Sequence, residues 1–417
     1  MFRCITELKG LAIDIDSFDE NIETDWHIWD GQYKYIFITS DEQIAEKLCQ
    51  QYGEEKVFVV KEYARFFAPN NAIHGSILQR LQLKATEIVY LSRDIQFLQN
   101  AMSFLGGSIW ITEEAVSYEN ASMAPDLVCN DLNALKKFLL EGVEGFYGEL
   151  TVFPAEDKKG AILPVRFKID DMAVPLYMIG RYFGYSHYMS QLHPYSSAIY
   201  LNKKEGKKYY RAYDAVFATI YKDTIRGIMK RWKAVDGICT VPVRPGKINR
   251  FREIVTDICD KLKIKDFSSQ LVCIKDYPAQ KNLSRQEREE NVKGVFQCTA
   301  DLTGKNVIII DDIVSTGETM RECVRQLKKA GADDVCIVVL AVNQMRGTYW
   351  SANDVYVECP ICSEKMHLLI NGRTKEFFYS CYKCAKTISF SRGREKLCKK
   401  VDDEFAVEKI TLHDKFY

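Results

Sequence analysis

A run of thirteen residues, from 307 to 319, combines two carboxylates with small hydroxyl-bearing residues, an arrangement suited to a sugar phosphate. Its sequence is VIIIDDIVSTGET. The apolar part predicts a strand buried on both faces, as in a parallel sheet. Asp311 and Asp312 would then lie at the carboxyl end of that strand, where open α/β sheets bind ligands. Their carboxylates can accept hydrogen bonds from two neighbouring sugar hydroxyls.

The loop after the two carboxylates is suited to hold a phosphate group. Backbone N–H groups and hydroxyls at the start of a helix can surround such a group. The residues that would do so are Ser315, Thr316, Gly317, Glu318 and Thr319. Together with the carboxylates, they predict a ribose 5-phosphate pocket. The alternative is a plain strand-to-helix turn with a Ser/Thr cap and two solvated acids.

The whole run resembles the phosphoribosyl pyrophosphate (PRPP) signature of type I phosphoribosyltransferases. The resemblance implies that Asp311 and Asp312 face the 2′- and 3′-hydroxyls of ribose and that residues 315–319 hold the 5′-phosphate. It also implies Mg²⁺ as a cofactor, bridging pyrophosphate and ribose oxygens. The protein would position the sugar and neutralise charge on the leaving group, without a nucleophile of its own.

Two further segments extend the resemblance to the ComF-like phosphoribosyltransferases, over about residues 213–345. After a predicted strand at 237–243, Arg244 and Lys247 are expected to contact pyrophosphate, unless they belong to an ordinary basic loop. Residues 279–296 are polar and predict a hood that closes over PRPP. The positions that match the ComF-like pattern are Gln280, Leu283, Ser284, Glu287, Arg288, Asn291, Val292, Gly294 and Phe296.

Basic residues of this hood are candidates to complete the charge around PRPP when the hood closes. They are Lys281, Arg285 and Arg288. The alternative is the solvated face of an amphipathic helix. A nucleobase or nucleotide is the expected class of acceptor, but the sequence does not identify its pocket.

Four of the fourteen cysteines form two C-x₂-C pairs, separated by eighteen residues. This spacing predicts a structural Zn²⁺ site with four thiolate ligands. The ligands would be Cys359, Cys362, Cys381 and Cys384. Apolar segments at 366–370 and 376–380 predict the hairpin of a zinc ribbon, with Asn371-Gly372 at its turn. A redox pair and buried free thiols are the alternatives, and His367 is a spare ligand.

Basic residues surround this predicted ribbon and indicate either a nucleic-acid contact or a solvated basic surface. They are Arg373, Lys375, Lys383, Lys386, Arg392 and Arg394. ComF-like proteins usually carry their cysteine module before the transferase domain. Here the module follows it, so the resemblance does not extend to module order.

The N-terminal part alternates short apolar runs with helical segments, which predicts a doubly wound parallel sheet. The runs are at 11–15, 35–39, 56–60, 87–91 and 108–112. Asp14 and Asp16 follow the first run and resemble the first motif of the haloacid dehalogenase (HAD) superfamily. That resemblance implies a phosphoryl-accepting aspartate and an acid/base partner.

The remaining HAD motifs match less completely. Thr39, or its neighbour Ser40, would supply the second motif, and Lys84 would supply the third. Asp94 stands where a catalytic member needs acidic residues for Mg²⁺, but Arg93 precedes it and would oppose the cation. A phosphatase, a degenerate HAD-like domain used for binding or dimerisation, and another doubly wound domain all stay open.

Composition places the chain among ordinary globular proteins. Its 417 residues suggest about two to four domains, and its 57 basic and 57 acidic residues cancel. No overall attraction to nucleic acid or membrane follows from that balance. No apolar run approaches the roughly 18 residues that span a bilayer, and no signal peptide is evident. We therefore expect a cytoplasmic protein with no membrane partner and with its scattered cysteines reduced.

The predicted architecture is α/β with three parts. Residues 1–145 would form the HAD-like doubly wound domain, residues 213–350 a type I phosphoribosyltransferase-like parallel sheet, and residues 351–417 the zinc ribbon and a tail. Residues 146–212 carry no recognised motif and are expected to be an insertion or linker.

Three functional hypotheses follow. The first is Mg²⁺-dependent transfer of ribose 5-phosphate from PRPP to an unidentified acceptor. The second is a non-catalytic module that senses PRPP or a nucleotide in a nucleic-acid-linked system, such as DNA uptake or phage defence. The third is a HAD-type phosphohydrolase. Nucleic-acid or protein partners and a homo-oligomer stay open.

Overall fold

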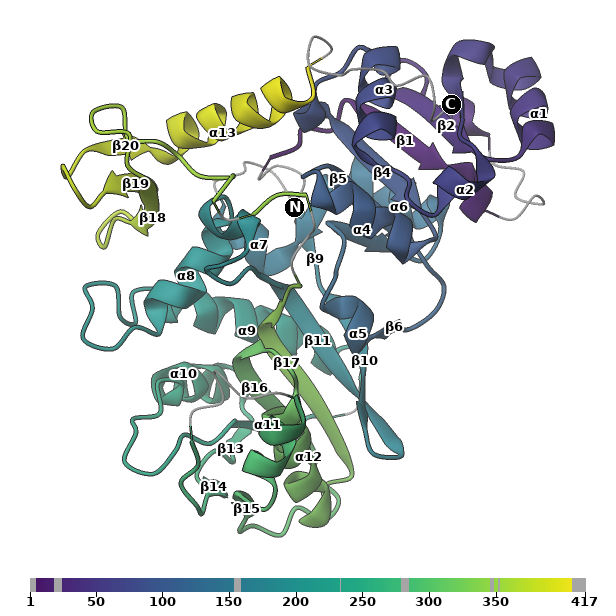
Figure 1. Cartoon of the computed structure of the whole chain (residues 1–417). Coiled ribbons are helices and arrows are strands. Elements are labelled where there is room, and N and C mark those ends of the chain that lie inside the picture. Colours follow the sequence, from purple (N-terminus) through teal and green to yellow (C-terminus); the bar gives the residue numbers. More distant parts are fainter. Residues whose placement is uncertain are drawn as a thin grey trace.

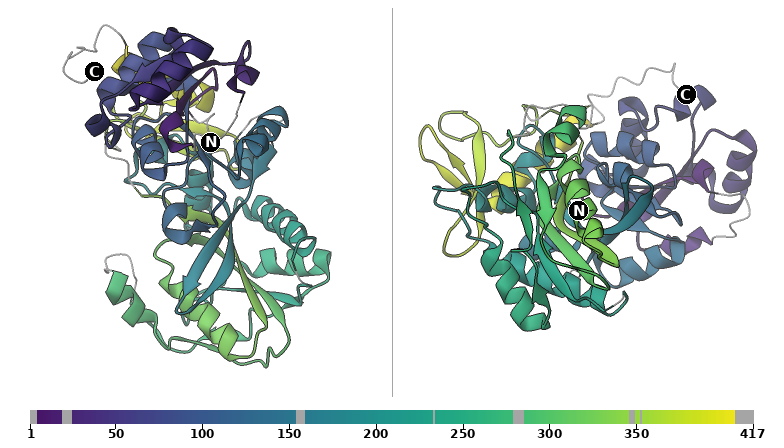
Figure 2. Two further views of the ribbon diagram at one scale, coloured as in Figure 1. Left: turned by 90° about the vertical axis from the view of Figure 1, so that its right-hand side faces the viewer. Right: turned by 90° about the horizontal axis from the view of Figure 1, so that it is seen from below.

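The computed structural model describes residues 5–18, 25–153, 159–232, 234–278, 285–345, 349–351 and 353–406. Two parallel sheets dominate these ranges, and a small three-stranded module carries the clustered cysteines. Figures 1 and 2 show the N-terminal unit at one end of an elongated molecule and the second sheet toward the other end. Within the described residues, no helix combines the length and the apolar character needed to cross a bilayer.

The N-terminal unit is a doubly wound sheet in which all pairings are parallel. Its strands lie in the order β3 (Val57–Val59), β2 (Lys34–Thr39), β1 (Gly10–Asp14), β4 (Ile88–Ser92), β5 (Gly107–Ile111) and β7 (Leu127–Cys129). All five predicted strands are confirmed. The order reverses between β1 and β4, which opens a crevice at their carboxyl ends.

Helices cover both faces of this first sheet, which explains why its strands are apolar throughout. Residues of α1 (Glu42–Tyr52) and α6 (Leu132–Leu140) belong to one buried cluster. Residues of α3 (Asn71–Leu81) and α4 (Ile95–Ser103) belong to the other, which continues into the rest of the molecule.

The second sheet has seven strands and is parallel except for one antiparallel pair, β10 with β11. Its order is β13 (Lys265–Asp266), β12 (Gly237–Thr240), β16 (Asn306–Val314), β17 (Asp334–Asn343), β11 (Met172–Tyr182), β10 (Leu163–Ile169) and β6 (Val116–Ser117). The segment 146–212, expected as an insertion or linker, thus supplies two strands of this sheet. The N-terminal unit supplies its edge strand β6.

Helices also flank the second sheet. They are α8 (Pro194–Asn202), α9 (Asp214–Met229), α10 (Arg252–Leu262), α11 (Arg285–Val292) and α12 (Glu318–Lys329). The antiparallel ribbon of β14 (Leu271–Cys273) and β15 (Phe296–Cys298) precedes and follows the predicted hood. A short loop, residues 315–317, connects the end of β16 to the start of α12 at the carboxyl edge of the sheet.

The cysteine module (residues 353–406) contains β18 (Met366–Ile370), β19 (Phe377–Cys381) and β20 (Thr387–Ser389). It ends in a long helix, α13 (Phe390–Glu404), where only a short tail was expected. Figure 1 shows α13 extending from the module to the N-terminal unit. There the backbone N–H and hydroxyl of Thr86 donate to Asp402 Oδ1 at 3.0 and 2.9 Å. The module therefore contacts both units.

A buried ionic network joins the two sheets at the end of β11. Arg181 has a side chain only 4% exposed, and its Nε donates to Glu149 Oε1 at 2.9 Å. Its second terminal nitrogen lies 2.9 Å from Asp126 Oδ1. Asp126 belongs to the N-terminal unit and accepts a hydrogen bond from the backbone of Ser108 at the start of β5. One buried cation thus serves carboxylates from different parts of the fold.

We expect Arg181→Met to lower the free energy of unfolding by about 3–5 kcal/mol, because it leaves buried carboxylates without their counter-charge. Arg226→Met is the control, since Arg226 is half-exposed and pairs at 3.0 Å with the partly exposed Asp223. That change should cost less than about 1 kcal/mol. Urea unfolding of both variants measures the difference, and equal losses would contradict a structural role for the network.

Candidate functional site

The two signature carboxylates lie where β16 loses one of its neighbours. Pairing of β16 with β12 ends at Ile310, opposite Thr240, while pairing with β17 continues to Val314. Asp311 and Asp312 therefore emerge at the carboxyl edge, beside the end of β12. The two carboxyl groups lie close enough to interact, and the backbone N–H of Asp312 donates to Asp311 Oδ1 at 2.9 Å.

Two cations hold Asp312. Its Oδ2 lies 2.6 Å from a terminal nitrogen of Arg250 and 3.7 Å from Nζ of Lys203. Burial opposes ionisation of this carboxyl, but Lys203 and Arg250 outweigh it and hold the pKa of Asp312 below its usual value. Asp312 is therefore a carboxylate with a ready charge partner on each side.

Asp311 has the opposite electrostatic character. Burial, together with the neighbouring negative charge of Asp312, raises the pKa of Asp311 to about 7. Its backbone carbonyl accepts a hydrogen bond of 2.6 Å from the hydroxyl of Tyr221 on α9, which fixes the strand at this point. The pair thus combines an ionised acid with one that changes protonation near neutral pH.

Gly317 shapes the loop between β16 and α12. Its φ of 86° is a conformation that residues with a Cβ rarely adopt, and an added Cβ would lie 2.9 Å from the Phe167 ring. Tyr118 donates to the carbonyl of Ser315 at 2.7 Å, and Arg321 donates to that of Thr316 at 2.9 Å. Hydrogen bonds from Tyr118 and Arg321 to backbone carbonyls thus fix the conformation of the loop.

The start of α12 is open to an anion. The N-cap position is Gly317, which has no side chain that could cap the helix. The first N–H groups of a helix point along its axis and can bind an anion. Ser315 is exposed and Thr319 half-buried, but the Glu318 side chain is buried and pairs with Arg321 at 2.7 Å. Of the groups of Glu318, only the backbone N–H can therefore bind a phosphate, because the side chain is buried and already paired.

The other predicted basic residues are less closely gathered. Arg244 lies in the loop after β12 and donates to the carbonyl of Tyr277 at 3.2 Å, next to the hood, while Lys247 is exposed. Arg288 is half-buried on α11, which packs against α12. Lys281, like the side chain of Arg285, lies outside the described residues.

Sequence reasoning missed both cations at Asp312. Arg250 lies three residues beyond Lys247, in the same loop after β12. The basic residues of that loop could have indicated that Arg250 also belongs to the site. Lys203 follows α8, in the segment without a motif, and nothing in its surroundings indicated the contact.

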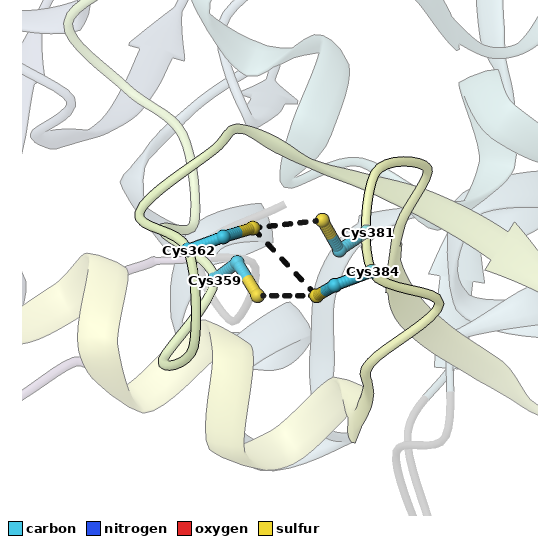
Figure 3. Close-up of side chains that lie close together, drawn as sticks. All are labelled: Cys359, Cys362, Cys381 and Cys384. Carbon is cyan, nitrogen blue, oxygen red and sulfur yellow. Dashed lines mark hydrogen bonds between the residues drawn. The ribbon is translucent and has the colours of Figure 1, made fainter.

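The four clustered cysteines form a second candidate site, which Figure 3 shows in close-up. Sulfur atoms of Cys359 and Cys384 lie 3.4 Å apart, Cys362 and Cys381 3.5 Å, and Cys362 and Cys384 3.6 Å. Four sulfurs about 2.3 Å from one Zn²⁺ would be about 3.8 Å apart, close to this arrangement. The donor set fits a structural Zn²⁺ site, and Zn²⁺ would cross-link the two turns.

The backbone around Cys359 also favours a thiolate. Burial alone would raise the pKa of this thiol, but N–H groups of Ile361 and Cys362 donate to its sulfur and lower the pKa to about 6. His367 does not join the cluster; its ring stacks on Tyr382, with centroids 4.2 Å apart.

We expect the purified protein to contain one equivalent of zinc and Cys384→Ser to lose most of it, because three thiolates leave the tetrahedral site incomplete. Cys49→Ser, a change of a free cysteine on α1, is the control and should keep the metal. Elemental analysis of both variants provides the measurement. Full zinc content in Cys384→Ser would refute the ligand set.

The N-terminal aspartates lie in the crevice between β1 and β4, around an arginine that was not predicted. Arg65 lies 2.6 Å from Asp14 Oδ2, 3.7 Å from Asp16 Oδ2 and 4.0 Å from Asp94 Oδ2. Burial raises the pKa of Asp14 to about 6, even though Arg65 and Ser92 act to lower it. The guanidinium occupies the place of a cation, so these residues do not fit Mg²⁺.

The second predicted motif lies with this cluster, but the third does not. Thr39 and Ser40 both donate to Asp16, Ser40 through N–H and hydroxyl at 2.7 Å. Lys84 precedes β4 and lies at the opposite, amino-terminal edge of the parallel sheet, so its predicted role is wrong. Arg93, expected to oppose a metal, instead pairs with Glu113 at 3.2 Å.

Comparison with known families identifies one part of the chain. Residues 265–367 match the model of the phosphoribosyl transferase domain, a span that includes β16, the signature loop and α12. This part is therefore a phosphoribosyltransferase-type domain, as its signature predicted. The match begins after the loop of Arg244 and Lys247.

Similar proteins cover short stretches. The transcriptional regulator GfcR of Thermoplasma acidophilum is 37% identical over 83 residues, 19% of this chain and 36% of that protein. The GfcR of Picrophilus torridus is 48% identical over 42 residues, 10% and 22% of the two chains. A ribose-phosphate pyrophosphokinase of Methanosarcina acetivorans is 54% identical over 35 residues, 8% and 12%. The chain thus spans about a third or less of these relatives.

Proposed function

We propose that this chain binds PRPP with Asp311, Asp312 and residues 315–319 and transfers its ribose 5-phosphate to an acceptor. The observation that carries the proposal is the juxtaposition of a carboxylate pair with the start of α12, whose N-cap is a glycine, at one edge of a parallel sheet. A diol donates to the carboxylates, and a phosphate accepts from the helix start. Ribose 5-phosphate carries both groups.

The proposed reaction needs little covalent help from the protein. The bond between ribose C1 and the pyrophosphate oxygen breaks, and its electron pair leaves on pyrophosphate. An acceptor atom forms the new bond to C1, and the acceptor's proton passes to solvent. Mg²⁺, bound with PRPP, would neutralise charge on pyrophosphate. Asp311 and Asp312 would orient the ribose for that displacement.

Arg250 and Lys203 fit this role as charge partners that are already in place. Both lie beside Asp312 and compensate its charge. When ribose hydroxyls donate to Asp312, the same cations can turn part of their charge to phosphoryl oxygens. Arg244 and Lys247 stay candidates for pyrophosphate, as the resemblance to type I transferases implies. The hood residues Lys281, Arg285 and Arg288 stay candidates to complete the charge around PRPP when the hood closes.

A second function has its own support. Several relatives are named transcriptional regulators, and the cysteine module adds a basic surface. The domain would then sense PRPP or a nucleotide without turnover and pass the signal to a nucleic-acid-linked partner. Pyrophosphate release across a panel of bases separates the two functions: release supports the transferase, while tight binding without release supports the sensor.

We expect the double change Asp311→Asn/Asp312→Asn to weaken PRPP binding at least about tenfold in the presence of Mg²⁺, because neutral amides replace charge-assisted acceptors. Asp301→Asn, at an exposed turn of the same domain, is the control and should bind as the parent does. Isothermal titration measures both. Unchanged affinity in the double variant would remove these residues from the site.

The affinity for ribose 5-phosphate should also rise with pH between about pH 6 and about pH 8. The pKa of Asp311 is raised to about 7, so below that pH the carboxyl carries a proton and accepts poorly from ribose hydroxyls. Binding then favours the deprotonated form, and the gain levels off above the pKa. Asp311→Asn should lose this part of the slope while keeping that of the ligand phosphate. An identical slope in both proteins would exclude titration of Asp311.

A further inference from the structure

A cavity of about 190 Å³ lies between the N-terminal unit and the second sheet. Helix α4 and the residues that follow α5 (Tyr118–Ala121) border it from the N-terminal side. The end of β11 and the residues that follow β11 and β17 border it from the other side. None of its described lining residues belongs to the carboxylate pair, the signature loop or the cysteine module. The cavity is therefore separate from the ribose phosphate site and from the cysteine site.

Thioethers and aromatic rings give the cavity an adaptable apolar surface. Met102, Met123 and Met189 line it together with the rings of Phe183 and Tyr188. Both rings are more than nine-tenths buried, and the Tyr188 hydroxyl donates to the Met102 carbonyl at 3.0 Å, which fixes its ring. Methionine side chains adjust to irregular shapes and pack well against aromatic rings. Such a surface suits a planar ligand with apolar faces.

The charged groups of the cavity do not favour an anion. Among the described lining residues, Arg181 is the one lysine or arginine. Its guanidinium is already paired, with nitrogen atoms 2.9 Å from Glu149 Oε1 and 2.9 Å from Asp126 Oδ1. The ring of His187 is neutral, because its Nδ1 accepts from the backbone N–H of Met189 at 3.0 Å. A phosphate or carboxylate would meet no uncompensated cation among these residues, which favours an uncharged ligand.

Side-chain amides of α4 supply directional contacts. The amide nitrogen of Gln99 lies 2.9 Å from Met123 Sδ, and that of Asn100 donates to a backbone carbonyl at 3.0 Å. Among the described residues, none donates to the amide oxygens of Gln99 and Asn100, so this wall offers two acceptors. Arg181 offers a donor, since its Nη1 makes only a long bond of 3.4 Å to a backbone carbonyl. A ligand with a ring N–H and a carbonyl would pair with both kinds of group.

We propose that this cavity is a regulatory site for a small, uncharged lactam heterocycle, a flat ring that carries neighbouring C=O and N–H groups. Its size agrees with this class. Pockets for drug-sized ligands begin at roughly 300 Å³, so a cavity of about 190 Å³ suits one ring or two fused rings. Uracil and hypoxanthine are ligands of this class.

The regulatory role follows from the contacts that hold the cavity wall. Gln344 lines the cavity and donates to the carbonyl of Ala121 at 3.0 Å, while its Oε1 accepts from the N–H of Ala124 at 2.9 Å. Tyr118, at the start of the same short helix α5, donates to the Ser315 carbonyl of the signature loop at 2.7 Å. A ligand that orders this wall would lower the cost of ordering the loop and thereby tighten PRPP binding. This consequence rests on the function proposed for the loop.

Isothermal titration of the full chain with uracil and with hypoxanthine tests the site. At least one of them should bind with a dissociation constant below about 1 mM. Indole, which has no carbonyl to accept from Arg181, should bind at least about fivefold more weakly. Gln99→Leu should also weaken binding at least about fivefold, because the ligand N–H loses its acceptor. Gln50→Leu, the same change at an exposed position of α1, is the matched control and should bind as the parent does.

Titration with PRPP and Mg²⁺ tests the regulatory role. The heterocycle at saturation should tighten PRPP binding at least about fivefold. Tyr118→Phe should remove most of this gain, because it deletes the hydrogen bond to the Ser315 carbonyl. Thermal unfolding verifies that each variant folds, and Asn100→Leu replaces Gln99→Leu if that variant does not.

The outcomes separate this site from the proposed function. If neither heterocycle binds, or if binding withstands both Gln99→Leu and Asn100→Leu, the inference is overturned. Binding that Asp311→Asn/Asp312→Asn abolishes belongs to the carboxylate pair and overturns it as well. If a heterocycle binds in the cavity and PRPP affinity stays unchanged, the regulatory role is overturned. If PRPP binds under no condition, the proposed function fails, while heterocycle binding that depends on Gln99 still supports the cavity as a ligand site.

Discussion

The unequal pairing of β16 is the constraint on which the candidate site depends. On one side its partner β12 stops at Thr240, and on the other β17 continues beyond Val314. A buried parallel strand would normally satisfy its polar groups on both sides. Here the early end of β12 leaves room at the sheet edge for two carboxylates, and the continued pairing with β17 keeps their backbone rigid. The site therefore arises from strand length as much as from the residues themselves.

The charges at this edge follow from the same arrangement. Asp311 and Asp312 interact with each other, but only Asp312 pairs closely with cations. Asp312 reaches Arg250 and Lys203 and stays ionised, while Asp311 lies without a comparable partner and keeps its proton to higher pH. Adjacent residues of identical type thus acquire different acidities, from the cations near Asp312 and from the interaction of the two carboxyl groups.

Local patterns in the sequence were sufficient for much of the fold. The buried strand around 307–310 and the cysteine hairpin carry periodicity or spacing within a few residues, and both were predicted. Strand β16 is longer than expected, because it continues through the two carboxylates to Val314. Strands β10 and β11 were not recognised. Pro175 interrupts the apolar run of β11, and β10 alternates between buried and exposed residues, so neither resembles a central parallel strand.

Contacts between distant segments explain the remaining errors. Arg65 reaches Asp14 across 51 positions, and Lys203 reaches Asp312 across more than 100, so no local window contains either pair. Lys84 was misplaced for a related reason. Its position before β4 is evident from the sequence, but only the parallel register shows that this end of β4 lies away from Asp14. Helix α13 was overlooked, and one of its partners, Thr86 before β4, lies 316 positions from Asp402 in the chain.

The N-terminal unit has a structural connection to the phosphate loop that does not require chemistry of its own. Arg65 already neutralises its aspartates, which argues against a metal-dependent reaction there. Tyr118, in the segment that leaves this unit, donates to the Ser315 carbonyl and packs edge-on against Phe167 at 4.9 Å. Phe167 in turn occupies the space that a side chain at Gly317 would need. Tyr118 and Phe167 therefore fix the loop proposed to hold phosphate, and the conformation of that loop depends on packing from outside the matched domain.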